Sequence, residues 1–307
     1  MGSAMGRAEA AGHPLWEGEG LVPFQMVLEG GAMRNLFTCG VVDYFMDKRV
    51  FPESVVGTSA GAICGFNYAS GAVGRMAYCN LQYRGDWRFM SLRSKLLTGN
   101  YVGSNFIFDT IPNQIEHLSM EWFAESPIKL TSVASDLISG RADYFDYDDA
   151  PDFKRGQQYL IASSSVPFVN RPVDVDDKRL LDGGVCDSIP YAHGRPHYRG
   201  RQIIVLTRPH GYWQRPARGM GFAKMLYRRY PQFLQRMQQR PDGYNAQMEQ
   251  VAQLHDQGEA YAIWPIADLD ISLSERNTKK LFAAYELGVE TAAKQWPDIA
   301  RYLGLGR

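Results

Sequence analysis

One serine set among small residues constrains the fold of this chain more than any other feature. Residues 57–61 read Gly-Thr-Ser-Ala-Gly, the spacing G-x-S-x-G, directly after the apolar pair Val55 and Val56. This spacing is typical of a strand that turns sharply into a helix, with a nucleophile, here Ser59, at the apex. Small neighbours avoid a clash with the strained turn, and the helix N-terminus favours negative charge on the hydroxyl. The spacing is also common by chance, so alone it equally indicates a small-residue turn with an incidental serine.

A second glycine-rich turn comes earlier in the chain. Residues 24–28 predict a short buried strand, residues 29–34 read Glu-Gly-Gly-Ala-Met-Arg, and apolar residues at helical spacing follow. A dinucleotide-binding loop is disfavoured, because G-x-G-x-x-G would need glycine in place of Ala32 and Asn35. Paired glycines at a helix start instead present free backbone N–H groups, which can bind the oxyanion of acyl transfer. Three roles stay open for Arg34. It stabilises this loop, it contacts an anionic head group, or it is an ordinary surface residue.

The third candidate element is an aspartate followed by two glycines. Residues 173–185 predict a hairpin in which Asp182 precedes Gly183 and Gly184. Such an aspartate can point into a site with little steric cover, although the same pattern is common in turns. In a Ser-Asp-His hydrolase a histidine would act as base, whereas a buried carboxylate beside the serine can also act directly. The candidates for that histidine are His193, His197, His210 and His255.

The composition is that of a globular protein with a sizeable core. The chain has 307 residues, of which 45% are hydrophobic and 21% are charged. Its 33 basic and 33 acidic residues give a formal net charge of zero, so bulk charge does not indicate nucleic acid as a partner. The four cysteines are widely spaced without a C-x-x-C pair, which favours buried thiols in a reduced cytoplasmic protein over disulfides or a metal site.

No segment of the sequence reads as a membrane span or as a signal peptide. The apolar runs are shorter than the roughly 18 to 20 residues that a bilayer requires. Residues 1–20 also lack the apolar core of a signal peptide. We expect these twenty residues to be a flexible leader outside the fold.

Together, the three motifs resemble the patatin-like phospholipase family. They are Glu-Gly-Gly-Ala-Met-Arg at 29–34, Gly-Thr-Ser-Ala-Gly at 57–61 and Asp-Gly-Gly at 182–184, in the order and spacing of that family. The resemblance implies an α/β fold, a three-layer α/β/α sandwich with a mostly parallel central sheet. It also implies lipid acyl hydrolase activity through a Ser-Asp dyad without histidine.

The resemblance assigns a role to each motif. It implies that Ser59 is the nucleophile and Asp182 the base. The family usually has a third glycine and a closing glycine where this chain has Ala32 and Asn35. Alanine still offers its N–H, and asparagine tolerates positive φ, so the loop can keep its geometry. The implied oxyanion hole is the backbone of Gly30, Gly31 and Ala32.

Beyond residue 210 the composition changes. Residues 205–209 and 240–245 resemble a bacterial branch of the family with its own C-terminal extension. Periodicity predicts helices over 221–239, 241–257 and 274–296 and a strand over 260–265. The basic residues Arg228, Arg229, Arg236 and Arg240 are expected on one helix, with a solvated face favoured over a membrane-facing one. The expected segments are a flexible leader at 1–20, a patatin-like catalytic domain at 21–210 and a mainly helical extension at 211–307 packed on the core.

Aromatic, methionine and basic residues are dense after the serine motif. The apolar ones either fill the core or line a cleft for an acyl chain. Arginines among them, such as Arg75, Arg84, Arg88 and Arg93, either face solvent or meet lipid head groups at the rim. The apolar residues of this set are Phe66, Tyr68, Met76, Tyr78, Tyr83, Trp87, Phe89 and Met90.

The sequence therefore predicts a serine hydrolase that cleaves carboxylic esters of lipids or phospholipids through an acyl-enzyme, with no metal or cofactor. It predicts a cytoplasmic protein with no nucleic-acid partner, and peripheral contact with a membrane stays open. Two alternatives also stay open. One is a binding or scaffold protein with a weakened hydrolase site, and the other is a His-dependent esterase of small esters.

Overall fold

A mixed β-sheet forms the centre of the molecule. The structure, a computed structural model, describes residues 14–116, 118, 120–193, 201–216 and 219–306. Within these residues the strand order is β5-β6-β3-β2-β1-β7-β8, with β4 also paired to β3. The run from β3 through β8 is parallel, and β4, β5 and β6 pair antiparallel. The strands are β1 Leu21–Leu28, β2 Phe51–Thr58, β3 Lys129–Asp136, β4 Ala142–Asp146, β5 Val173–Val175, β6 Lys178–Asp182, β7 Arg201–Val205 and β8 Tyr261–Ile263.

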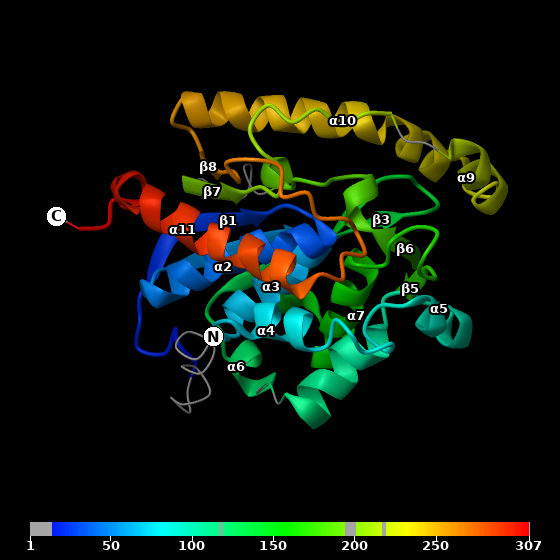
Figure 1. The fold of residues 1–307 in the computed structure, drawn as a ribbon, viewed down its shortest axis with the longest axis horizontal. Helices are drawn as coiled ribbons and strands as arrows, with labels where there is room; N and C mark the ends of the chain where they lie inside the picture. Colours follow the sequence, from blue (N-terminus) through cyan, green and yellow to red (C-terminus); the bar gives the residue numbers. More distant parts are fainter. Residues whose placement is uncertain (1–13, 117, 119, 194–200, 217–218, 307) are drawn as a thin grey trace.

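Helices cover both faces of this sheet. Helix α10 crosses one face, and α2, α3, α4 and α11 lie on the other (Figure 1). The helices are α2 Asn35–Asp47, α3 Ala60–Ala69, α4 Arg75–Gln82, α5 Leu92–Thr98, α6 Met120–Ala124, α7 Phe153–Ser163, α9 Met220–Leu226, α10 Pro231–Asp256 and α11 Thr278–Leu303. Shorter turns are η1 Ala32–Arg34, η3 Tyr147–Asp149 and η4 Gly183–Val185, and η2 Phe106–Ile115 is a π-helix.

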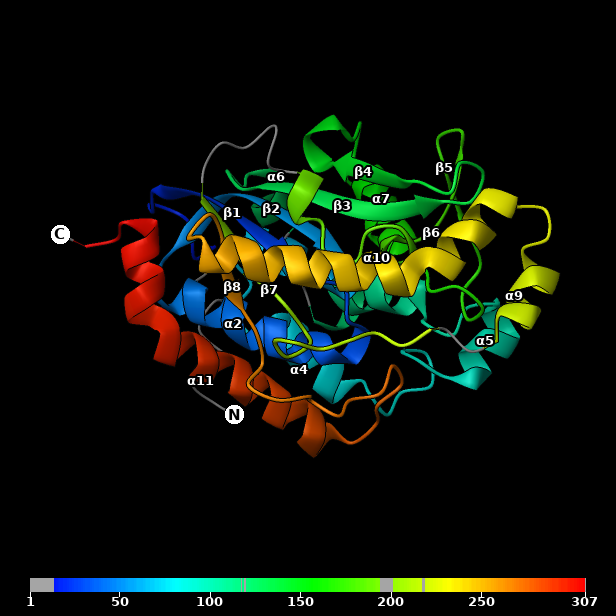
Figure 2. The same ribbon diagram turned by 90° about the horizontal axis from the view of Figure 1, so that it is seen from above.

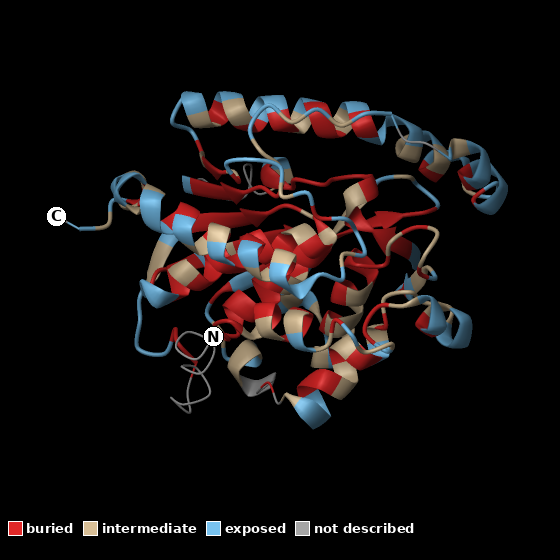
Figure 3. Cartoon of the chain, in the orientation of Figure 1, coloured by how far each residue is buried: buried red, intermediate tan, exposed pale blue. Residues whose placement is uncertain are grey.

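The parallel strands at the centre of the sheet, β1, β2, β3 and β7, are buried along most of their length because both faces are covered. Met26 and Leu28 of β1 pack in the cluster that includes α2 and α3, whereas Val27 packs with Val251 of α10. Figure 3 shows this double burial as strands that are coloured red along most of their length. Near-continuous apolar runs are typical of buried parallel strands. The predicted three-layer α/β/α fold with a mostly parallel sheet is confirmed.

The C-terminal part of the chain continues the same sheet. Strand β8 pairs parallel with β7, and α11 packs along α2. One predicted boundary is wrong, because α10 runs unbroken through Pro241, where the sequence suggested two helices. Proline removes one helical hydrogen bond, but here Pro241 is buried, and packing of α10 on the sheet stabilises the continuous helix. The boundary between two helices lies instead between α9 and α10, and Pro231 takes the first position of α10.

Part of the expected leader packs on the core. Residues 1–13 lie outside the described residues, but Leu15 and Trp16 are buried, and Trp16 Nε1 donates to Ala69 O at 2.8 Å. Burial of these two side chains was not expected from the sequence. Among the described residues, no helix combines the length and the apolar character needed to cross a membrane.

Candidate active site

Ser59 stands at a strained turn between β2 and α3. Its backbone has φ 56° and ψ −124°, a conformation that side-chain-bearing residues rarely adopt. Glycine is required on either side of Ser59 because neighbouring backbone atoms lie too close to leave room for a side chain. A Cβ on Gly57 would lie 2.7 Å from the amide nitrogen of Ala62, and one on Gly61 would lie 2.5 Å from Leu28 O. The spacing G-x-S-x-G therefore has a steric cause in this fold.

The side chain of Ser59 meets that of Asp182. Ser59 Oγ donates to Asp182 Oδ2 at 2.5 Å, although the two residues are 123 positions apart. Asp182 ends β6, and its other oxygen, Oδ1, accepts from the Gly184 amide at 2.8 Å. The Ser59 amide donates to Ser163 Oγ at 2.9 Å, which fixes the turn against α7. Both Ser59 and Asp182 are buried, so this hydrogen bond is shielded from bulk water.

Burial raises the pKa of Asp182 above its ordinary value. The hydrogen bonds from Ser59 and Gly184 and the positive charge of Arg240 act against this increase. A carboxylate that is poorly solvated has a higher proton affinity, which is what a direct base for a serine hydroxyl needs. The surroundings of Asp182 therefore suit proton transfer from Ser59.

The glycine-rich loop after β1 lies beside this pair. The Gly30 amide already donates to Ser188 O at 3.1 Å, so only two of the three expected oxyanion donors remain, Gly31 and Ala32. Gly31 is the N-cap of the η1 turn and Ala32 is its first residue, where backbone N–H groups lack partners within the helix. Ala32 has φ 48°, the strained conformation that glycine would adopt more easily.

Asn35 adopts an ordinary negative φ, although the position that glycine holds in the family could have required a positive one. Its φ is −63°, and its side chain donates to Glu29 O at 2.9 Å, which ties the two ends of the loop together. The two departures from the family pattern therefore have different consequences. The backbone strain is at Ala32, and Asn35 contributes a hydrogen bond that glycine could not make.

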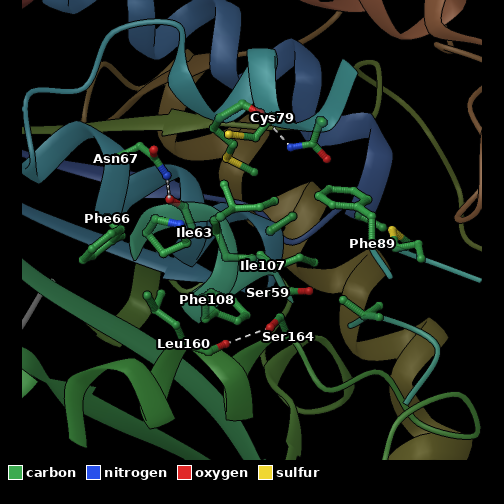
Figure 4. A pocket seen from close by; sticks show the side chains of 18 of the residues that line it. Ser59, Ile63, Phe66, Asn67, Cys79, Phe89, Ile107, Phe108, Leu160 and Ser164 are labelled. Atoms are coloured by element: carbon green, nitrogen blue, oxygen red, sulfur yellow. Dashed lines mark hydrogen bonds between the residues drawn. The ribbon is translucent and has the colours of Figure 1, made fainter. Parts of the chain in front are cut away.

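Ser59 lies where two cavities meet. A cavity of about 310 Å³ contains Ser59, Asp182 and the loop 30–32, with Arg34 and Arg240 in its wall. A second, apolar cavity of about 120 Å³ extends from Ser59 between α3, α4, η2 and α7 (Figure 4). Residues common to both are Ala32, Ser59, Val166 and Leu273.

Only half of the expected acyl-cleft residues line the apolar cavity. Phe66, Met76, Phe89 and Met90 do so. Of the others, Tyr68 is fully buried in the core, and Tyr83 donates to Glu116 Oε1. Several further lining residues come from η2 and α7, where no sequence motif indicates them; they include Ile107, Phe108, Ile111 and Leu160.

Helix α10 reaches the site with basic and aromatic side chains. Arg240 Nε donates to Gly184 O at 2.5 Å, and Arg236 donates to Cys186 O at 2.5 Å. The expected solvated basic helix is thus partly wrong, because these two arginines hold the turn that follows Asp182. Arg228 and Arg229 lie in the link between α9 and α10.

A buried carboxyl connects α10 to the glycine-rich loop. Glu29 is 1% exposed; its Oε1 accepts from Tyr244 Oη at 2.8 Å, and its Oε2 accepts from the Thr207 amide at 2.5 Å. Burial raises the pKa of Glu29, whereas these hydrogen bonds and nearby Arg34 lower it. The first motif contains Glu29, but no sequence signal indicated its contact with Tyr244.

The described histidines have other surroundings. His193 stacks on Tyr144 with ring centroids 3.6 Å apart, and His210 packs edge-on against Trp264. His255 Nδ1 accepts from the Ala262 amide at 3.1 Å. His197, the fourth candidate, lies outside the described residues. The side chain that accepts from Ser59 Oγ is the carboxylate of Asp182.

Within the described part of the chain, no cluster of three or more histidine, cysteine or acidic side chains could hold a metal ion. The four cysteines are buried as free thiols, as their spacing indicated.

Two family models match the chain. One, described as patatin-like phospholipase, matches residues 26–193, and the other, a domain of unknown function (DUF6363), matches residues 230–304. An uncharacterized protein of Escherichia coli, YjjU, is 25% identical over 212 residues, which cover 64% of this chain and 56% of YjjU. An uncharacterized NTE family protein of Mycobacterium tuberculosis, Rv1063c, is 25% identical over 169 residues, covering 54% of this chain and 44% of that protein.

The chain thus spans about half the length of these curated relatives. Among solved structures, VipD of Legionella pneumophila aligns over 91% of this chain and 67% of its own, with 11% identity and a TM-score of 0.45. The match to the family model covers more than half of the sequence and includes all three motifs. The chain belongs to the patatin-like phospholipase family.

Proposed function

We propose that this protein is a lipid acyl hydrolase with Ser59 as nucleophile and Asp182 as base. One observation carries the proposal: the 2.5 Å hydrogen bond from Ser59 Oγ to Asp182 Oδ2 lies where a cavity with Arg34 and Arg240 in its wall meets a second cavity that is apolar. A lipid ester has the same division, since an apolar acyl chain and a polar head group meet at the scissile carbonyl.

The proposed reaction has two steps. In the first, Ser59 Oγ attacks the ester carbonyl while its proton passes to Asp182, and the amides of Gly31 and Ala32 hold the oxyanion. Collapse of the tetrahedral intermediate breaks the ester bond, and Asp182 returns the proton to the departing alcohol. In the second step, water attacks the acyl-enzyme and gives its proton to Asp182. The fatty acid then leaves as Ser59 regains its proton.

The two cavities give the substrate an orientation. The acyl chain would enter the apolar cavity beyond Ser59, where each buried methylene contributes roughly 0.8 kcal/mol. The head group would lie in the larger cavity, beside Arg34 and Arg240. The Nε atom of Arg34 is buried and has no hydrogen-bond partner among the described residues. An anionic head group such as phosphate would supply one.

Support for lipid substrates also comes from the family, whose model is described as patatin-like phospholipase. The geometry needs no metal or cofactor for the proposed steps. A His-dependent esterase is less favoured, because the described histidines have partners away from Ser59. A scaffold with a weakened site is also less favoured, because Ser59 and Asp182 are already hydrogen-bonded.

Hydrolysis of p-nitrophenyl esters tests the proposal. Ser59→Ala and Asp182→Asn should each lower activity by several orders of magnitude without unfolding the protein. Asp187→Asn is the matched control, since Asp187 is a neighbouring buried carboxylate that contacts Tyr144 and Gln247 instead of Ser59. Retention of more than about one per cent of activity by Ser59→Ala would refute the assignment.

The chain length of the ester tests the lipid part separately. We expect kcat/KM to rise from short to long acyl chains, and to rise further when the ester aggregates. A preference for the shortest ester, unchanged by aggregation, would indicate a small-ester hydrolase.

A further inference from the structure

Two short helices carry their apolar residues outward. In α5 only Ser94 is buried, while Leu92, Leu96 and Leu97 are 72%, 86% and 66% exposed. In α9 only Ala223 is buried, while Phe222, Met225 and Leu226 are 55%, 64% and 49% exposed. Amphipathic helices of globular proteins normally face the core with such residues. We call these six residues the apolar rim; they are Leu92, Leu96, Leu97, Phe222, Met225 and Leu226.

The apolar rim borders the mouth of the catalytic cavity. Helices α5 and α9 lie at the same end of the molecule in both views (Figures 1 and 2). Phe168 connects them, because its carbonyl accepts from Lys95 Nζ and its ring lies 5.8 Å from that of Phe222. Phe168 and Met220, the first residue of α9, line the cavity that holds Ser59 and Asp182. The exposed apolar side chains therefore belong to two helices that are both linked, through Phe168, to the wall of this cavity.

The charged residues of the two segments that carry the apolar rim are all basic. Residues 91–99 contain Arg93 and Lys95 and no acidic residue. Residues 219–230 contain Lys224, Arg228 and Arg229, again with no acidic residue. Apolar side chains that alternate with Lys and Arg are typical of surfaces that bind anionic membranes. A symmetric second copy of the chain would instead bring these like charges together.

We propose that the apolar rim docks on an anionic lipid bilayer, with its apolar side chains among the acyl chains and its basic residues at the head groups. Docking places the entrance of the catalytic cavity at the lipid surface, so that a phospholipid can pass from bilayer to site without crossing water. The purpose of this surface rests on the proposed lipid hydrolase function, but binding itself requires no catalysis.

Vesicle binding by the Ser59→Ala protein tests the surface without hydrolysis. We expect co-sedimentation with vesicles of phosphatidylcholine and phosphatidylglycerol, and weaker binding to phosphatidylcholine alone. Leu96→Asp with Leu97→Asp, or Met225→Asp with Leu226→Asp, should each weaken binding by about tenfold or more. Arg228→Gln with Arg229→Gln should remove the preference for phosphatidylglycerol. The control is Ile266→Asp, because Ile266 is 78% exposed and lies outside both helices.

Activity with Ser59 intact provides the second readout. The rim variants should hydrolyse a short, soluble p-nitrophenyl ester at the parent rate and lose most hydrolysis of vesicle phospholipid. Rim-dependent vesicle binding without any ester hydrolysis would support the surface while refuting the proposed enzyme. Vesicle binding equal to the parent in the rim variants would overturn the inference. The inference would also be overturned if the parent sedimented as a dimer and the rim variants as monomers. The rim would then be the interface with a second copy of the chain.

Discussion

At the scale of single residues, two positions of the candidate site have a strained backbone. Ser59 has φ 56° and Ala32 has φ 48°, and each such conformation costs on the order of 1–3 kcal/mol. Contacts on both sides hold them: Ser163 accepts from the Ser59 amide, and Asn35 ties the loop to Glu29. Ser59 and Ala32, together with Gly31, line the same cavity.

Arg240 should set the pH at which Asp182 becomes active as a base. Its positive charge lowers the pKa of Asp182, so Arg240→Gln should raise that pKa. The base must be ionised, and activity therefore rises with pH through the pKa of Asp182. The acid limb of kcat/KM should move to higher pH in the variant. Arg301→Gln, which removes an exposed charge on α11, is the control, and an unmoved limb in Arg240→Gln would contradict the account.

At the scale of elements, α10 contacts two loops of the candidate site. Tyr244 contacts Glu29 next to the glycine-rich loop, and Arg240 contacts the turn after Asp182. One helix of the C-terminal region therefore supports two of the three sequence motifs. The matched domain of unknown function begins at residue 230, directly before this helix.

Loss of the Tyr244 hydroxyl should affect both stability and catalysis. Tyr244→Phe removes a hydrogen bond to a buried carboxyl, which costs roughly 1–3 kcal/mol in the free energy of unfolding. Because Glu29 precedes the oxyanion loop, we also expect kcat to fall more than KM rises. Tyr212→Phe is the control, since the Tyr212 hydroxyl makes only a 3.4 Å contact with Gln214. Denaturant unfolding and steady-state kinetics measure both effects, and unchanged kcat would refute the coupling.

Local features of the fold could be predicted from the sequence, and long-range contacts could not. The turn at Ser59 follows from glycines that lie two residues away, because the steric constraint is local. The approach of Asp182 depends on the antiparallel register of β6 against β3, which no spacing encodes, and only the family resemblance indicated it. The contacts of Arg236 and Arg240 depend on where α10 docks. Periodicity normally places the apolar residues of a helix against the core. The apolar residues of α5 and α9 face outward, so their exposure could not be predicted either.

At the scale of the whole molecule, the two terminal parts of the chain are packed together. Helix α11 lies along α2, and Asp43 of α2 is buried there, with Oδ1 accepting from the Gly74 amide at 3.0 Å. Burial raises the pKa of Asp43 from 3.8 to about 7. The folded state therefore prefers the neutral carboxyl over a wide range of pH.

This buried acid should make stability fall as pH rises. Below pH 3.8 Asp43 is neutral in both states, and its contribution is lost as pH rises through about 7, where the folded state must ionise it. The loss is on the order of 4 kcal/mol. Asp43→Asn keeps the acceptor for Gly74 and should be more stable than the parent above pH 7, by an amount that shrinks toward pH 4. Asp47→Asn, exposed on the same helix, is the control, and a difference independent of pH would contradict the prediction.

Ser59 is proposed to act as a nucleophile that Asp182 activates. Intact-protein mass spectrometry after treatment with a fluorophosphonate tests it most directly, because this reagent forms a stable bond to an activated serine. We predict one adduct per chain on the peptide that contains Ser59, absent in Ser59→Ala and formed far more slowly in Asp182→Asn. His193→Ala, His210→Ala and His255→Ala should label at the parent rate. A folded protein that stays unlabelled, or that carries its adduct on another residue, would contradict the account.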